Sequence, residues 1–195
     1  MREKHIVGID LAGKATNPTG WALFRNKQIQ TCHLFTTKAI LSHTYNCSPT
    51  LVALDAPTTW PNKSKMRKAD RQMHKFGYPV LPPLFPAMKT LTQRAIKITK
   101  KLKEDKIHVI EVHPTSTRKA LGMPTKNWKR IQEILQKLGY TGDIETRPLT
   151  PHEIDAATAA LTAHLHTKRK TKLVGDPKEG CIVIPLKDDW TRLQT

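Results

Sequence analysis

The chain has 195 residues, a length typical of one domain, and we expect a single domain spanning residues 1–195. Its 33 Lys and Arg outnumber its 16 Asp and Glu and give a net charge of +17, which favours a polyanionic partner, above all nucleic acid. It contains no apolar run of about 18 residues and no secretory signal pattern, so we expect no membrane association and a cytoplasmic location. Its three cysteines lack CxxC spacing, which argues against a disulfide framework and a thiolate zinc site.

The first part of the chain predicts three consecutive strands, at residues 5–10, 19–25 and 28–35. A helix is expected around residues 38–45. A fourth strand follows at residues 50–57, where the nearly continuous apolar stretch "TLVALDAP" is typical of a strand covered on both faces.

Residues 57–83 show little periodicity, and a connection of this length in a compact domain is usually functional. Its segment "KSKMRKADRQMHK" has six basic residues and one Asp, with Trp60, Phe76 and Tyr78 around it, so we expect a basic insertion loop that contacts nucleic acid. The alternatives are an ordinary solvated face, or a loop that Arg67, Asp70 and Arg71 order over a site. The expected phosphate contacts are Lys14, Lys63, Lys65, Arg67, Lys68, Arg71 and Lys75.

The second half of the chain alternates helices with strands. Apolar residues at steps of three and four predict a helix over residues 86–104 and another from Trp128 to a stop at Gly139. Strands are expected at residues 107–114 and 181–185, with a third helix from Thr150 between them. The whole order predicts an α/β fold with a mixed sheet, in which an antiparallel meander is extended by parallel strands.

Three carboxylates interrupt strands that should be apolar: Asp10, Asp55 and Glu111. Acidic residues are uncommon in strands and are rarely buried without a partner. Asp10 and Asp55 both end their strands, and the carboxyl ends of parallel strands meet at one edge of a sheet. These two side chains are therefore expected to lie together.

The segment "TPHEIDAATAALTA" predicts a helix with a further carboxylate. Thr150 and Glu153 form a capping box, which explains Glu153 structurally. Asp155 has no such explanation, and its alanine-rich surroundings indicate a helix pressed closely onto the sheet. His152 lies three residues earlier, on the same helix face as Asp155.

Clustered carboxylate oxygens on a basic protein suit Mg²⁺ or Mn²⁺, with Asp10, Asp55 and Asp155 as the expected ligands. The expected catalytic residues are these three together with Glu111 and His152. These are the parts of metal-assisted phosphodiester hydrolysis by two ions. The alternative reading pairs each acid with one of the many basic residues as a structural ion pair.

The ordered motifs "VGIDLAG", "TGWAL", "VALDAP", "VIEVHP", "ALG", "HEIDAATAALTA" and "GDPKEG" resemble the family called domain of unknown function 429, over about residues 4–186. The last helix is also similar to that of RuvC-type Holliday-junction resolvases. The resemblance implies a ribonuclease H-like fold: a five-stranded mixed sheet in which the first three strands are antiparallel, the fourth and fifth run parallel to the first, and helices cover both faces. It implies a predicted nuclease, with Asp10, Asp55 and Asp155 as ligands. Glu111 is either a site acid or a group that binds a loop, because resolvases place no ligand on that strand, and Asp55 stands where they use a glutamate.

Three functions are weighed: a metal-dependent nuclease acting on DNA or RNA, a non-catalytic nucleic-acid-binding module, and an actin-like-fold nucleotide phosphotransferase suggested by "GIDLAGK". Short length and few glycines disfavour the third. Resolvase-like chemistry would favour a dimer, although the sequence shows no dimer surface.

Overall fold

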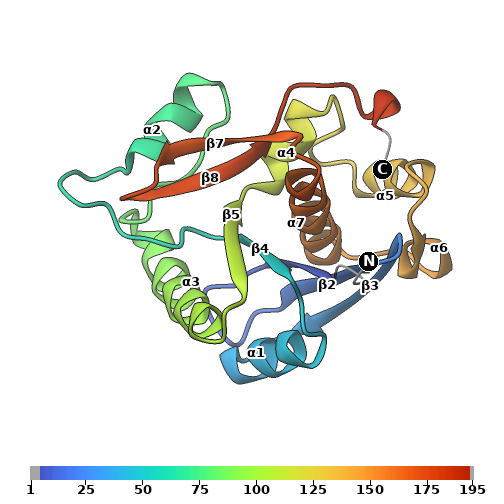
Figure 1. The fold of residues 1–195 in the computed structure, drawn as a ribbon, viewed down its shortest axis with the longest axis horizontal. Coiled ribbons are helices and arrows are strands. Elements are labelled where there is room, and N and C mark those ends of the chain that lie inside the picture. The colour runs from blue at the N-terminus through green and yellow to red at the C-terminus, as the bar shows by residue number, and fades with distance from the viewer. Residues whose placement is uncertain (1–4, 194–195) are drawn as a thin grey trace.

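The computed structural model describes residues 5–193. Eight strands form one mixed sheet in these residues (Figure 1). They are β1 (Ile6–Asp10), β2 (Thr19–Arg25), β3 (Gln28–Leu34), β4 (Leu51–Asp55), β5 (His108–Val112), β6 (Thr141–Gly142), β7 (Thr171–Asp176) and β8 (Gly180–Pro185). The helices are α1 (Thr37–Asn46), α2 (Lys68–Lys75), α3 (Pro86–Glu104), α4 (Pro114–Ala120), α5 (Trp128–Lys137), α6 (Asp143–Thr146) and α7 (Pro151–Thr167), with a 3₁₀ turn at Trp190–Arg192.

The strand order is β6-β3-β2-β1-β4-β5-β8-β7. Its middle confirms the expected core: β1, β2 and β3 are antiparallel neighbours, and β4 and β5 run parallel to β1. The expectation of five strands is wrong, because β8 adds beside β5, β7 pairs with β8, and β6 extends the other edge. The sequence did not reveal β7 because this edge strand is half-exposed along most of its length and lacks an apolar alternation.

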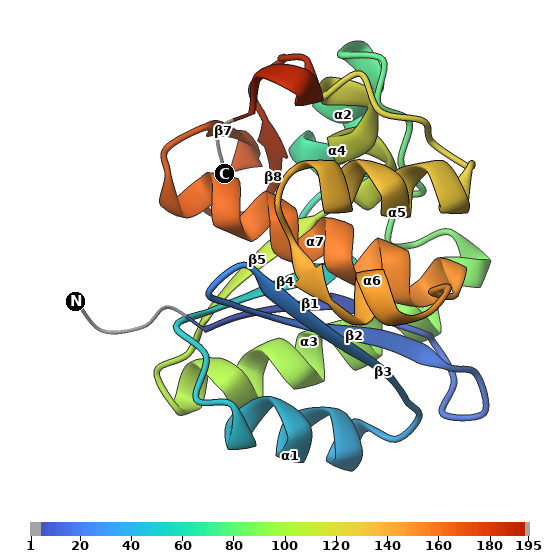
Figure 2. The same cartoon turned by 90° about the vertical axis from the view of Figure 1, so that its right-hand side faces the viewer.

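Helices cover both faces of the sheet, as expected. Figure 2 shows α1 and α3 below the sheet and α7 above it, with α5 stacked over α7. On the α3 side, Val7, Ile9, Val52 and Leu54 pack with Ala95, Ile98 and Leu102 of α3. This alternation of side chains along each strand decides which strand residues face α7.

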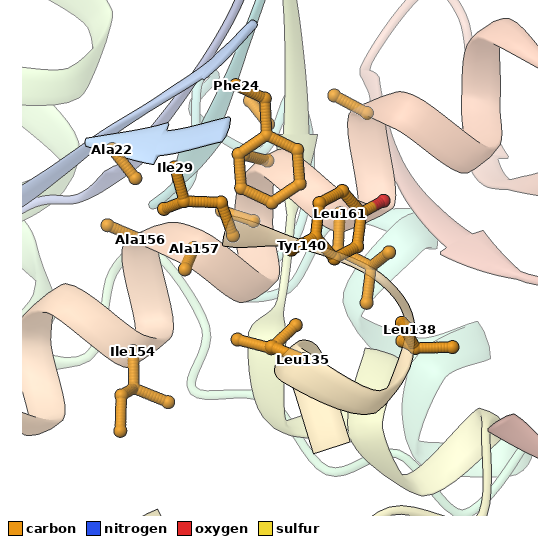
Figure 3. Packing of buried hydrophobic residues seen from close by; sticks show 14 of the residues in the cluster. Ala22, Phe24, Ile29, Leu135, Leu138, Tyr140, Ile154, Ala156, Ala157 and Leu161 are labelled. Carbon is orange, nitrogen blue, oxygen red and sulfur yellow. The ribbon is translucent and has the colours of Figure 1, made fainter. Parts of the chain in front are cut away.

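The α7 side of the sheet is packed unusually closely. Figure 3 shows Ala156 and Ala157 of α7 beside Ala22 and Ile29. A Cβ atom on Gly8 would lie 2.0 Å from the Ala156 carbonyl oxygen, and one on Gly20 would lie 2.0 Å from the His152 carbonyl oxygen. Glycine in the strands and alanine in the helix therefore let the two backbones touch, which fixes the height of α7 above β1.

The insertion at residues 57–83 is partly helical. Its helix α2 packs on the β7–β8 hairpin through Ala69 and Met73, which join Val174, Ile182 and Ile184 in a separate apolar cluster. Helix α4 was not expected, because it begins at Pro114 directly after β5 and is only seven residues long. Among the described helices, none is both long enough and apolar enough to cross a membrane.

Candidate active site

Two carboxylates lie side by side where the sheet reaches its carboxyl edge. Asp10 and Asp55 are the last residues of the parallel strands β1 and β4, and they are register partners. Both follow residues that pack toward α7 at alternate positions, namely Ile6 in β1 and Ala53 in β4, so both side chains lie on the α7 face. The sequence-based expectation that these two residues meet is realised in the register of the sheet.

Helix α7 brings its first turns over this pair. The Nδ1 atom of His152 lies 2.7 Å from Oδ2 of Asp10, and the His152 side chain remains about half exposed. Asp155 follows one turn later, and its side chain is 22% exposed. The helix starts at an N-cap formed by Thr150, with Glu153 closing the capping box, so its first turn is held firmly.

The contacts of Glu153 confirm the capping box that the sequence predicts. Arg147 contacts it at 2.5 and 3.1 Å, and the Thr150 amide and hydroxyl donate to it at 3.0 Å. Burial alone would raise the pKa of Glu153, but the hydrogen bonds from Arg147, Thr150 and Thr31 lower it to about 2. The Glu153 carboxylate therefore anchors the start of α7.

Burial and mutual repulsion raise the pKa values of Asp10 and Asp55. Burial raises the pKa of Asp10 to about 6; nearby Asp155 adds to the increase, whereas the hydrogen bond with His152 opposes it. Burial also raises the pKa of Asp55 well above 3.8, with further repulsion from Asp10 and Asp155. No hydrogen bond or ion pair reaches the Asp55 carboxylate from residues 5–193. The charge of Arg118 opposes both increases, but burial is the larger effect, so the two strand carboxylates resist carrying two negative charges together.

Arg118 of α4 is the cation that Asp155 contacts, and the sequence-based reasoning missed it. Its guanidinium is fully buried, donates to Asp155 Oδ1, and lies 5.3 Å from the Trp128 ring centre. Burial raises the pKa of Asp155, and the charge and hydrogen bond of Arg118 oppose that increase. The only sequence signal was a basic residue one turn into the segment after "VIEVHP", which is too common to single out.

Glu111 lies apart from the Asp10–Asp55 pair. It is the register partner of Leu54 and therefore faces the α3 side, opposite to Asp55. Its carboxylate accepts from the Thr58 amide at 2.8 Å and from both terminal nitrogens of Arg67, at 2.6 and 2.8 Å. These contacts are those of an acid that binds a loop, the second of the two readings weighed from the sequence.

Arg67 corrects one expected nucleic-acid contact. Its side chain is 1% exposed, because Glu111 on one side and Asp70 on the other enclose the guanidinium. Burial would lower the pKa of Arg67, but the bonds to the two carboxylates raise it. The guanidinium therefore orders the insertion over the strand ends, and it offers no surface to a phosphate.

The other basic residues expected to contact nucleic acid are exposed: Lys14, Lys63, Lys65, Lys68, Arg71 and Lys75. Two of them have local partners. Arg71 donates to Ser64 and to the Met66 carbonyl, and Lys68 lies 3.6 Å from Asp176. The turn between β7 and β8 holds the insertion from below, since the Glu179 carboxylate accepts from the Asn62 and Lys68 amides.

A pocket of about 220 Å³ opens at these strand ends. Its lining includes Asp10, Asp55 and Glu111 from the strands, together with residues of the insertion and of α3. His113 also faces it, and burial lowers the pKa of His113 to about 4, with a smaller contribution from Arg118. The pocket therefore joins the expected site acids to the insertion that the sequence singled out.

The expected three-carboxylate metal centre is not preformed. Within residues 5–193, no three His, Cys, Asp or Glu side chains are grouped so that they could hold a metal ion. Asp155 instead contacts Arg118. In the "GIDLAGK" loop, β2 and α3 supply the hydrogen-bond partners of Ala12, whose amide donates to Thr19 and whose carbonyl accepts from Arg94.

Residues 8–179 match the model of a protein family of unknown function, DUF429. This chain belongs to the DUF429 family. The matched range includes both strand carboxylates, the insertion, Arg118 and the start of α7. The family resemblance seen in the sequence motifs is thereby confirmed for nearly the whole DUF429 chain.

Two solved structures of Thermus thermophilus RuvC are similar to this DUF429 chain. RuvC in complex with a Holliday junction substrate is 15% identical with a TM-score of 0.47, and a second RuvC structure is 14% identical with a TM-score of 0.46. Each comparison covers 85% of this chain and 96% of RuvC. No curated protein sequence matches the chain.

Proposed function

We propose that this protein is a divalent-metal-dependent nuclease that hydrolyses phosphodiester bonds in DNA or RNA. The observation that carries the proposal is the pair Asp10 and Asp55, in register at the carboxyl ends of two parallel strands and covered by the α7 residues His152 and Asp155. A ligand site in a sheet of this kind lies outside the carboxyl ends of its strands. The net charge of +17 would draw a phosphate backbone to this edge.

The donor chemistry fits Mg²⁺ or Mn²⁺. Both ions prefer carboxylate oxygens, and the Asp55 carboxylate lacks a partner within the described residues while Asp10 repels it. Asp10 and Asp55 would hold the ion, with Asp155 as the third ligand. Two such ions, when bound, would activate water and stabilise the charge that develops on a phosphodiester.

The remaining roles belong to side chains of this chain. His152 orients the Asp10 carboxylate through its 2.7 Å contact and, being half exposed, is placed to exchange a proton with solvent. Arg118 keeps Asp155 in place and neutralises it. Glu111 acts through Arg67 by holding the insertion against the strand ends, so it is a positioning residue.

The test is cleavage of labelled single-stranded, duplex and branched DNA and RNA in the presence of Mg²⁺ or Mn²⁺. We expect cleavage of at least one of these substrates, and Asp10→Asn should lower its rate by about two orders of magnitude or more, because a charged group at the reacting centre is lost. The matched control is Asp105→Asn, an exposed residue between α3 and β5 at the opposite edge of the sheet. Equal activity of wild type and Asp10→Asn would sink the proposal.

One observation favours a second function, a nucleic-acid-binding module without catalysis. Asp155 is paired with Arg118, and the described residues contain no ready metal site. That function predicts salt-sensitive binding that neither metal ions nor Asp155→Asn alters. The same cleavage panel separates the two, because a binding module retains the labelled substrates intact under every condition.

A further inference from the structure

The lining of the pocket beside Asp10 and Asp55 combines two chemically different sets of side chains, which we call its acidic wall and its apolar wall. The acidic wall is the set of four carboxyl groups in the lining, from Asp10, Asp55, Asp70 and Glu111, of which the last two are bonded to Arg67. The apolar wall is the set of apolar side chains that the insertion and α3 add to the lining, chiefly Val80, Leu81, Met88 and Leu91. A ligand that fills the pocket must satisfy both walls.

The acidic wall excludes a phosphate from the interior of the pocket. Four carboxyl groups and a single guanidinium line the pocket when no metal ion is bound, and that guanidinium already binds two of the carboxyl groups. An anion placed there would meet repulsion without a cationic partner. The exposed basic residues of the insertion, such as Lys63 and Lys65, do not line the pocket, so a phosphate backbone would run outside it.

Part of the apolar wall is exposed on the surface. Leu81 lines the pocket and is 53% exposed, and the next exposed apolar side chains along the chain are Leu84 and Phe85, at 40% and 48%. Large apolar side chains left in water next to a polar pocket mark a surface for binding. On a protein with this charge, they are suited to the flat faces of nucleobases, which stack on apolar and aromatic groups.

The size of the pocket limits what can enter. Pockets for drug-sized molecules measure about 300–1,000 Å³, so 220 Å³ accommodates one ring system and excludes a base pair. The carboxylate oxygens in its lining can accept hydrogen bonds from ring and exocyclic N–H groups. A neutral heterocycle with such donors satisfies both walls at once.

We propose that this pocket takes one unpaired nucleobase, so that the substrate of the site is a single-stranded or extruded nucleotide. The inference rests on the proposed function, because it names the substrate class of the same site. The base lies against the apolar wall formed by the insertion and α3. Its phosphate remains outside the pocket, toward exposed lysines such as Lys63 and Lys65.

The test is equilibrium binding in EDTA, where cleavage does not occur. The probes are fluorescein-labelled 12-nucleotide single-stranded DNA, the same RNA, the DNA duplex, and a DNA of equal length and charge whose internal nucleotides are all abasic. We expect the base-containing single strand of DNA or RNA to bind at least about tenfold more tightly than the abasic chain and the duplex.

Two leucine variants locate the effect. Leu81→Ala should weaken binding of the base-containing single strand by about three- to tenfold and leave the abasic chain unchanged, because only the apolar contact is lost. Leu173→Ala is the matched control, since Leu173 is 60% exposed on β7 and does not line the pocket. Both leucines are largely in solvent, so neither change should unfold the protein.

The proposal is overturned if the abasic chain or the duplex binds as tightly as the single strand, if none of the probes binds, or if Leu81→Ala and Leu173→Ala behave alike. These results are independent of cleavage. A failed nuclease proposal would leave the preference for single strands intact while the metal-loaded protein cleaves nothing. A failed base pocket would abolish the preference while cleavage persists.

Discussion

At the scale of single residues, the site contains two kinds of acid: carboxylates that repel one another, and carboxylates that accept hydrogen bonds from several donors. Glu111 and Glu153 have several donors each, from Arg67 and Thr58 or from Arg147 and Thr150. Asp55 has none within the described residues and is repelled by Asp10. Unsatisfied buried charge lowers stability, and proteins keep it where it serves function.

Asp55→Asn should therefore stabilise the protein by about 1 kcal/mol at neutral pH without divalent ions, because it removes one of two repelling carboxylates. Thermal unfolding measures this change. Millimolar Mn²⁺ should raise the melting temperature of the wild type and not that of Asp55→Asn, since an ion that binds only the folded state stabilises it. A destabilised Asp55→Asn with an unchanged response to Mn²⁺ would contradict the repulsion and the metal site together.

The side chain of His113 should make the free energy of unfolding sensitive to acid. Its pKa is lowered to about 4 in the folded protein, mainly by burial, whereas an unfolded histidine titrates near 6.5. Between these values the unfolded chain binds more protons, so stability present above pH 6.5 is lost as the pH falls toward 4. The expected loss is on the order of 2 kcal/mol.

Urea unfolding of the wild type and of His113→Gln between pH 7.5 and 4 measures this loss. The variant should show a shallower dependence on pH, whatever its stability at pH 7.5. His108→Gln is the control, because His108 is exposed at the start of β5. Parallel pH profiles for the wild type and His113→Gln would rule out the assignment.

At the scale of elements, the contact between α7 and the sheet decides where His152 and Asp155 lie. Glycines at positions 8 and 20 let the helix backbone rest on β1 and β2. Any side chain added there would push α7 away from the strand ends and separate His152 from Asp10. Backbone contact thus sets the geometry of the site as much as the acids do.

Gly8→Ala should cost about 3 kcal/mol or more, because the new methyl group would lie 2.0 Å from the Ala156 carbonyl oxygen and the interface must open. Gly77→Ala is the control: it has open space around it and a φ of 77°, so its cost is the left-handed strain of about 1–2 kcal/mol. Chemical denaturation of both variants measures the difference. Equal losses would show that α7 yields easily.

At the scale of the whole molecule, the charge of +17 predicts salt-dependent binding of nucleic acid. If each of the six exposed basic residues that the sequence singled out contacts one phosphate, the binding constant for a single strand should fall with salt at a log–log slope of about −4. Lys63→Gln with Lys65→Gln should reduce the slope by about 1. The double variant Lys100→Gln and Lys103→Gln on α3 changes the charge equally and should leave the slope unaltered. Equal slopes in all three proteins would place the nucleic acid elsewhere.

The sequence by itself determined the central strands, the start of α7, the pairing of Asp10 with Asp55 and the structural role of Glu153. These features depend on local pattern: apolar runs, a capping box, and the rule that parallel strands share their carboxyl edge. Alanines after Asp155 also predicted the close approach of α7, which Gly8 makes possible.

Only the tertiary structure decided the partners of the charged groups. The path of the insertion across β5 decides whether Arg67 reaches solvent or Glu111. These two residues lie 44 positions apart in the chain. The pairing of Arg118 with Asp155 and the edge strands β6 and β7 likewise come from long-range packing. Charge attraction is non-directional, and many basic residues could pair with each acid. The local sequence therefore indicated the acidic site residues but did not predict their partners.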